Sequence, residues 1–507
     1  MIAQVIFTLA GLAVFAHAIQ WITSRFDDER EPPRVSPKIP IIGHLLGIVQ
    51  HGANYYSMTS KRTDADIYTL DIFGTKLYVS NTHRLTSAIQ KSSKTLSFKP
   101  FIRTAARKFG GATDEVVALY SDSILDDFTH VMKTALAPGP DLDAQNMRMG
   151  KRVLVDIDDL ITQGQTGETR LLKWTRHAVC QASSCGIFGE HHPFLDQKVE
   201  DAFWVWQSYL LPHTVSFGDF AGTGYAARQQ VFDAMDTYCR QLPDDVAPVV
   251  SERARVLREA GVSEKEIAKQ QTTFVIAAFA NTAPTLYWTI YELFSRPEVL
   301  AEVRKEVLTE AVSGSSKEGF ALDVSALKTR CPLLLGVFQE TQRTRHIHAN
   351  IREITEDTLL DGKYLLKKGH FLQMPGQPIH NEQSVWGANA GNFDPYRFMT
   401  STDSTKRERG VPPSSFVSWG APPHLCPARQ FATTESMIVL ALLAVRLDLS
   451  PMQGRWEESP AVDTSDLVTM YNPKKDVALK VDAKEEWTGV WSLTMGESKT
   501  RVALASG

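Results

Sequence analysis

The passage from Phe416 to Ala432 constrains the fold most. In it, Cys426 lies between a loop that favours turns and a segment with the pattern of a helix. Glycine and proline, which favour turns, are frequent in the loop before Cys426. Pro427 suits the first turn of a helix, and apolar residues at helical spacing continue to Val445. The backbone N–H groups and the positive end of this helix stabilise a thiolate at Cys426, which makes the sulfur a candidate metal ligand. The alternative is a buried structural cysteine, the commoner fate of this residue.

Length and charge set broad limits. An apolar share of 43% among 507 residues, with 22% charged, is typical of a globular protein with a core. A net charge of -4 argues against nucleic-acid binding. Among the five cysteines, the only close pair is Cys180 and Cys185, whose spacing matches neither a redox C-x-x-C motif nor a zinc framework. Because glycosylation acceptors are also absent from the sequence, we expect the main domain to lie in a reducing compartment.

The N-terminus begins with an uncharged apolar run, Ile2 to Ile22, that is long enough to span a bilayer as a helix. A cleaved signal peptide is the alternative, and Ala16-His17-Ala18 imitates its cleavage site, but no basic region precedes the run. We therefore predict a transmembrane anchor over residues 1–23. The prolines that follow predict a stiff hinge over residues 24–43, and residues 44–507 then form the main domain.

The main domain is predicted to be rich in helices, with small sheets. Alternating residues over Asp66–Phe73 and Lys76–Ser80 predict two strands with a tight turn between them. The pattern is then mostly helical to about residue 310. Short strands return near Asp357–Leu366 and Val477–Val481. Since no internal repeat or second module is visible, the sequence indicates one large, mainly α domain with small β-sheets.

The cysteine loop resembles the haem-binding loop of the cytochrome P-450 family. Four positions are in register with that family's aromatic residue, glycine, basic residue and cysteine: Trp419, Gly420, His424 and Cys426. Two positions depart, since Pro422 stands where the family has a second glycine and Ala428 replaces the small residue after Cys426-Pro427. The resemblance implies the cytochrome P-450 fold, a haem b cofactor, and Cys426 as its axial iron ligand. A thiolate ligand of this kind favours O–O cleavage.

A second motif supports the resemblance. Glu340 and Arg343 have the family's E-x-x-R spacing, which places both side chains on one helix face. The same spacing recurs elsewhere by chance, at Glu31/Arg34 and Glu252/Arg255. Arg397 lies in a segment that resembles the family's P-E-R-F sequence, and it would complete a buried Glu–Arg–Arg cluster. The resemblance implies that this cluster locks the helix to the loop beneath the haem, with every buried charge paired.

The resemblance also implies contacts to the haem propionates. Arg352 stands where the family often has a cation for a propionate, and His424 would supply a second contact. For Arg352 the alternative is a surface charge on a strand. The family's W-x-x-x-R motif is not found in an earlier helix, and His130 or Lys133 is the candidate substitute. Glu435 matches a family glutamate to which we assign no function.

The helix expected to cross the distal haem face runs through Phe274–Trp288. Most family members carry an acid followed by a threonine there, a pair that delivers protons during oxygen activation, whereas this stretch contains no carboxylate. Its Ala-Asn-Thr-x-Pro sequence resembles a subset that includes sterol hydroxylases and prostacyclin synthase. Pro284 predicts a kink, where Asn281 and Thr282 would hold a water for proton delivery. The alternative is that Asn281 merely caps the kink.

The favoured function is monooxygenation of a hydrophobic small molecule, with O₂ and electrons from a separate NADPH-cytochrome reductase. No flavin or ferredoxin module fits in the chain, so the electrons must come from outside. A haem isomerase or dehydratase that needs no external electrons, and a non-catalytic haem binder, are the alternatives. Four apolar segments are expected to line the pocket unless they belong to the core: Phe203–Trp206, Leu210–Pro212, the surroundings of Phe279, and Ile347–Asn350.

The passages Gly186–Glu190 and Trp419–Ala432 are similar to filamentous-fungal members of the family. Those members commonly modify terpenoids, steroids or polyketides in secondary metabolism. Together with the predicted anchor, the resemblance implies a single-pass protein of the endoplasmic reticulum membrane whose catalytic domain is cytosolic.

Overall fold

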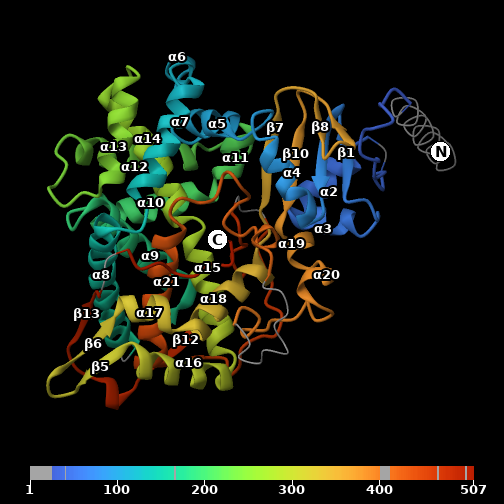
Figure 1. Cartoon of the computed structure of the whole chain (residues 1–507). Coiled ribbons are helices and arrows are strands. Elements are labelled where there is room, and N and C mark those ends of the chain that lie inside the picture. The colour runs from blue at the N-terminus through green and yellow to red at the C-terminus, as the bar shows by residue number, and fades with distance from the viewer. Residues whose placement is uncertain are drawn as a thin grey trace, which may run out of the picture.

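The computed structural model describes residues 25–39, 41–164, 167–399, 411–464, 468–496 and 499–506. Helices form most of the molecule, and the largest sheet lies beside the helical body, on the right in Figure 1. The mainly α architecture with small sheets predicted from the sequence is confirmed. The predicted transmembrane helix over residues 1–23 lies outside the described residues. Within the described ranges, no helix is long and apolar enough to cross a membrane.

The helical body surrounds α21 (Arg429–Arg446), the helix that follows the cysteine loop. Nearly all its side chains after the first turn are buried, because the stretch Met437–Val445 is apolar on every face. Helices α8 (Pro140–Gly164) and α18 (Pro332–Arg345) pack against it. Among the described residues, the other helices of eight or more residues are α2 (Gly43–His51), α5 (Lys99–Lys108), α7 (Asp122–Ala135), α9 (Leu171–Phe188), α10 (Gln197–Ser208), α12 (Thr223–Cys239), α13 (Pro248–Glu259), α14 (Glu264–Phe279), α15 (Thr282–Phe294) and α16 (Pro297–Glu310). Shorter helices are α3 (Asn54–Ser60), α4 (Thr86–Lys91), α6 (Asp114–Ala118), α11 (Leu210–Val215), α17 (Val324–Arg330), α19 (Gly376–His380) and α20 (Gln383–Trp386).

The largest sheet has the strand order β1 (Ile67–Ile72), β2 (Thr75–Ser80), β10 (Phe371–Pro375), β7 (Ala349–Ile354) and β3 (Leu96–Ser97). The predicted hairpin is therefore present, and its turn uses positive φ angles at Phe73 and Gly74. In β7, Arg352 lies opposite Leu372 of β10 in an antiparallel register. Because β7 lies between β10 and β3, Arg352 stands within the sheet and not on its edge strand. The smaller sheets join β11 (Leu447–Pro451), β12 (Ala478–Ala483) and β4 (Thr169–Arg170); β13 (Trp491–Thr494), β6 (Gly319–Asp323) and β5 (Val312–Ser315); and β8 (Thr358–Leu360) with β9 (Tyr364–Leu366).

The helix predicted over Phe274–Trp288 is broken into α14 and α15. The break falls at Ala280 and Asn281. Pro284 has no N–H to donate to the carbonyl of Ala280, four residues earlier, so the regular ladder cannot continue across this point. The predicted kink is confirmed, and it takes the form of a break one turn before the proline.

Part of the predicted hinge over residues 24–43 is attached to the largest sheet. The N–H of Val35 donates to the carbonyl of Thr69 at 3.0 Å, and the N–H of Thr69 donates to the carbonyl of Pro33 at 2.8 Å. Lys76 of β2 forms an ion pair with Glu31. This segment therefore extends the sheet beyond β1 and packs on the main domain.

Candidate active site

One cavity of about 420 Å³ brings together residues from distant parts of the sequence. Cys426 lines it from the loop before α21, and Asn281 and Thr282 line it from the break between α14 and α15. Arg352 lines it from β7, and His424 from the cysteine loop. Five of the predicted site positions thus meet: the sulfur at one wall, the two residues of the broken helix at another, and two basic side chains at the same cavity.

The cysteine loop is a tight turn. The N–H of Cys426 donates to the carbonyl of Trp419 at 2.7 Å. Gly420 has φ +96°, and a Cβ there would lie 2.5 Å from the carbonyl oxygen of His424, so only glycine fits without rearrangement. Burial raises the pKa of the Cys426 thiol, whereas a hydrogen bond from the N–H of Ala428 and the charge of Arg429 act in the opposite direction. Coordination to a metal would deprotonate such a thiol outright.

Arg352 is a buried cation without an anionic partner. Its side chain is 2% exposed, and its guanidinium donates to the carbonyls of Ile351 at 2.7 Å and Ala421 at 3.0 Å. Within the described part of the chain no carboxylate forms an ion pair with it, and burial lowers its pKa to about 10. A buried charge of this kind needs an opposite charge to be stable. The interpretation of Arg352 as an exposed surface charge is therefore wrong, and an anionic ligand group fits beside it.

Two further groups stand at the same end of the cavity. The rings of His424 and Phe98 lie 5.5 Å apart between centroids, and the Arg352 guanidinium lies 5.6 Å from the Phe98 ring. Burial, together with the charges of Arg352 and Lys133, lowers the pKa of His424 to about 4, so this imidazole is a neutral donor at pH 7. Of the two candidates for the missing W-x-x-x-R contact, Lys133 lines the cavity, whereas the exposed His130 is not among the lining residues.

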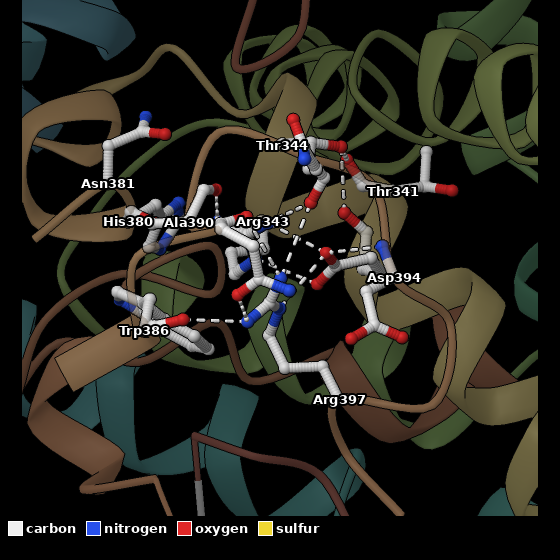
Figure 2. A network of polar contacts seen from close by, with 12 residues as sticks. Thr341, Arg343, Thr344, His380, Asn381, Trp386, Ala390, Asp394 and Arg397 are labelled. Carbon is white, nitrogen blue, oxygen red and sulfur yellow. Dashed lines mark hydrogen bonds and ion pairs between the residues drawn. The ribbon is translucent and has the colours of Figure 1, made fainter. Parts of the chain in front are cut away.

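The Glu–Arg–Arg cluster does not line the cavity. Figure 2 shows its polar contacts. Arg343 donates through Nε and Nη2 to the two carboxylate oxygens of Glu340, at 2.7 Å each, and both side chains are fully buried. Arg397 reaches the same carboxylate at 3.2 Å. The carboxylate also accepts the N–H of Asp394 at 2.9 Å. The cluster therefore joins α18 to the segment before the cysteine loop, which is a positioning contact.

The broken helix presents polar groups in place of a carboxylate. The Oδ1 atom of Asn281 accepts the N–H of Thr469 at 2.9 Å, so its Nδ2 atom remains a donor. The side chain makes no capping hydrogen bond to α15, which rules out the capping interpretation. The hydroxyl of Thr282 donates to the carbonyl of Ala278 at 2.7 Å. These contacts fix both side chains at the edge of the cavity.

The pocket-lining predictions divide into two groups. His348 and Asn350 of the segment Ile347–Asn350 line the cavity. Ala277 and Ala278, which precede Phe279, also line it, so the prediction for the surroundings of Phe279 is confirmed. Phe203 and Leu210 are buried core residues outside the cavity, and Phe203 packs edge-on against Phe279 with their ring centroids 5.2 Å apart. An apolar run does not reveal whether it faces a cavity or the core, so the prediction for Phe203–Trp206 and Leu210–Pro212 is wrong.

Two polar features of the cavity wall were not predicted. Gln342 and His346, at the end of α18, line the cavity beside His348 and Asn350. Glu435 of α21 also lines it, and its carboxyl accepts the hydroxyl of Ser183 at 2.9 Å. Burial and the neighbouring Asp156 raise the pKa of Glu435 to about 8. The only sequence signal for Gln342 and His346 is the run of polar residues in and after the E-x-x-R motif.

The cavity holds a thiol, a buried guanidinium with no ion-pair partner among the described residues, and a neutral imidazole, and this set fits haem b: Cys426 would bind the iron, and Arg352 and His424 would contact the propionates. Comparison with known proteins agrees. A model described as "Cytochrome P450" matches residues 33–477. The chain belongs to the cytochrome P450 family, whose cofactor is haem b with a cysteine thiolate as axial ligand.

Individual relatives extend this result. The chain is 30% identical over 514 residues to "Cytochrome P450 monooxygenase nodJ" of Hypoxylon pulicicidum, covering 99% of both chains. It is 33% identical over 183 residues to a "Bifunctional cytochrome P450/NADPH--P450 reductase" of Fusarium oxysporum, covering 36% of this chain and 16% of the relative. The crystal structure of a mutant cytochrome P450DA haem domain superposes with a TM-score of 0.68 at 19% identity, covering 90% of this chain and 98% of the other, which shows the shared fold. The chain is thus an enzyme of the P450 monooxygenase class.

Proposed function

We propose that this monooxygenase oxidises a hydrophobic small molecule, a terpenoid, steroid or polyketide of fungal secondary metabolism. The observation that carries the proposal is the single cavity in which Cys426, Arg352 and the broken distal helix meet. Most of its remaining wall is apolar or aromatic, including Phe98, Phe128 and Phe274, and such walls suit an apolar ligand. The full-length similarity to a monooxygenase of Hypoxylon pulicicidum supports the fungal setting.

Cys426 is the proposed axial ligand, and the haem that it holds supplies the chemistry of oxygen activation. The change Cys426→Ser replaces the sulfur by a hydroxyl that does not ionise at neutral pH. We expect the variant to lose the thiolate signature of the ferrous–carbon monoxide spectrum and all turnover. Cys239→Ser is the control, because Cys239 is also partly buried but lies at the end of α12 and away from the cavity. A normal thiolate signature in Cys426→Ser would overturn the assignment.

A separate NADPH-cytochrome reductase is the proposed electron donor. The Fusarium oxysporum relative, which joins a P450 and an NADPH–P450 reductase in one chain, supports this partner. The experiment first identifies the compound that accumulates when the gene is deleted, and then incubates it with the purified enzyme. A product that forms only with both NADPH and reductase supports monooxygenation. A product that forms without either supports a haem isomerase or dehydratase, an alternative that the lack of a carboxylate between Glu266 and Glu292 favours.

Asn281 and Thr282 are proposed to hold a water that delivers protons during the reaction. Their support is the placement of both side chains at the cavity and the donor that Asn281 retains. In Thr282→Val we expect the product formed per NADPH to fall by about tenfold or more, since positioned proton donors contribute at least this much. Thr285→Val is the matched control, because Thr285 also lines the cavity and its hydroxyl makes the same kind of bond, to the carbonyl of Asn281 at 2.7 Å, but no role in proton delivery is proposed for it. An unchanged product yield in Thr282→Val would contradict the role.

Residues 1–23 are proposed to anchor the protein in the endoplasmic reticulum membrane, with the catalytic domain in the cytosol. The uncharged run from Ile2 to Ile22 supports this proposal. A fluorescent fusion of the full chain should label the endoplasmic reticulum and resist carbonate extraction, and deletion of residues 1–23 should release it. Complete extraction of the full-length fusion would refute the anchor.

A further inference from the structure

A group of polar side chains forms one part of an otherwise mostly apolar cavity wall. Gln342 and His346 come from the end of α18, His348 precedes β7, and Asn350 lies within β7. We call these four residues the polar lobe. Gln342, His346 and Asn350 are at most 5% exposed. Buried polar groups normally have hydrogen-bond partners, so the partners of these side chains decide what the lobe does.

The described residues leave several atoms of the polar lobe without a hydrogen bond: the Oε1 atom of Gln342, both ring nitrogens of His346 and the Nδ2 atom of Asn350. Each such atom destabilises the fold when it is buried without a partner. Four of them in one short stretch of wall contribute nothing to the stability of the fold. A ligand in the cavity offsets this cost when it supplies partners for Gln342, Asn350 and one ring nitrogen of His346.

The His346 ring is held firmly in its place. It lies 5.4 Å from the ring of His380, between centroids, and a Cβ at Gly376 would come within 2.1 Å of the His346 Nδ1 atom. His380 is itself fixed, since its Nε2 atom accepts the N–H of Val417 at 3.0 Å. Because Nδ1 packs against Gly376, Nε2 is the nitrogen available to a ligand. A side chain fixed in this way loses little entropy on binding.

The chemistry of the polar lobe distinguishes between ligand groups. Burial lowers the pKa of His348 to about 4 and that of His346 well below its usual value, so both imidazoles are neutral at pH 7, each with one donor and one acceptor nitrogen. The Nδ2 atom of Asn350 donates, and the Oε1 atom of Gln342 accepts. A carboxylate or a carbonyl only accepts and would leave the Gln342 oxygen unpaired. A hydroxyl both donates and accepts, and therefore suits this mixed, uncharged set.

We propose that the polar lobe binds a hydroxyl group of the substrate, so that the substrate is a neutral alcohol with an otherwise apolar skeleton. The inference rests on the proposed function, because it places the alcohol in the cavity that the haem shares. It predicts that Gln342, His346, His348 and Asn350 determine specificity and orient the skeleton.

The test measures binding to the haem-loaded enzyme, independently of turnover. The probes are cyclododecanol, cyclododecanone and cyclododecane, together with the same three forms of a decalin skeleton, followed through the change that they cause in the haem absorption spectrum. We expect each alcohol to bind about 10- to 100-fold more tightly than its hydrocarbon, which is the range for one well-satisfied buried polar group, and more tightly than its ketone. Equal affinities within each set, or no binding of either alcohol, would overturn the proposal.

Variants separate a ligand-binding role from a structural one. In Gln342→Met and Asn350→Leu, apolar side chains of similar size replace unpartnered polar ones, so we expect the melting temperature to stay the same or rise while the preference for the alcohol falls about tenfold. Gln207→Met is the control, because Gln207 is also buried, both its amide atoms lack a partner among the described residues, and it does not line the cavity. A lower melting temperature with an unchanged preference would show a structural role and refute the inference. Loss of the thiolate spectrum in the wild-type enzyme would instead refute the proposed function.

Discussion

Arg343 offers the sharpest test of how the fold is held together. It is fully buried and donates to the carboxylate of Glu340 and to three backbone carbonyls, those of His380 at 2.7 Å, Ala390 at 2.6 Å and Asn392 at 3.0 Å. Its guanidinium also lies 5.2 Å from the Trp386 ring. Figure 2 shows Arg343 and Arg397 converging between Trp386, Ala390 and Asp394. Replacement by methionine keeps much of the volume and removes all of these hydrogen bonds.

The expected loss follows from these contacts. In Arg343→Met the Glu340 carboxylate stays buried with only Arg397 as its ion-pair partner, and three carbonyls lose a donor. Breaking a buried ion pair costs about 3–5 kcal/mol. The entropy of unfolding is about 2.1 cal/mol/K per residue, or about 1 kcal/mol/K for 507 residues, so Tm should fall by about 3–5 °C.

The chain contains its own control. Arg255 pairs with Glu252 at the same three-residue spacing, at 2.8 Å, but the two side chains are 47% and 43% exposed. Arg255 also pairs with the exposed Glu259 at 2.9 Å. Each exposed pair contributes less than about 1 kcal/mol, so Arg255→Met should lower Tm by less than about 2 °C. Tryptophan fluorescence and calorimetry on the haem-loaded variants measure both shifts. Equal shifts for the two variants would refute the argument that burial, and not spacing, gives the motif its effect.

Two further predictions concern the cavity. Burial raises the pKa of the Glu435 carboxyl to about 8, from 4.5 in an unfolded chain, so the folded state binds this proton more tightly. The contribution of this proton to stability is complete below pH 4.5. It is lost as the pH rises towards 8, by up to about 1.4 kcal/mol per pH unit. Glu435→Gln should therefore flatten the decline in urea midpoint between pH 5 and 8, and parallel curves would contradict this. In Arg352→Met the loss of a charge-assisted hydrogen bond to a propionate, about 1.5–3 kcal/mol, should speed haem transfer to apomyoglobin by about 10- to 100-fold, and an unchanged rate would reject the propionate contact.

Several features were predictable because their signals are local. The turn at Phe73 and Gly74 is marked by alternating strands on both sides, and α21 by a proline start followed by an apolar run. The Glu340–Arg343 pair follows from a fixed spacing on one helix face. The Glu340–Arg343 pair differs from the Glu252–Arg255 pair in its burial, and the spacing of residues in the sequence does not predict burial. The same limit explains why Phe203 and Leu210 were expected at the pocket and lie in the core.

The sequence by itself determined the chemistry that this protein can perform, because a cysteine between a glycine–proline turn and a helix is a short-range arrangement, complete within Trp419–Ala428. The tertiary structure decided which polar groups lack partners. Arg352 is an ordinary strand residue until β10 and the cysteine loop enclose it, and His346 is an ordinary helix-end residue until Gly376 and His380 close around its ring. Burial and hydrogen bonding depend on segments that lie far apart in the chain, and those are the properties that make a side chain available to a ligand.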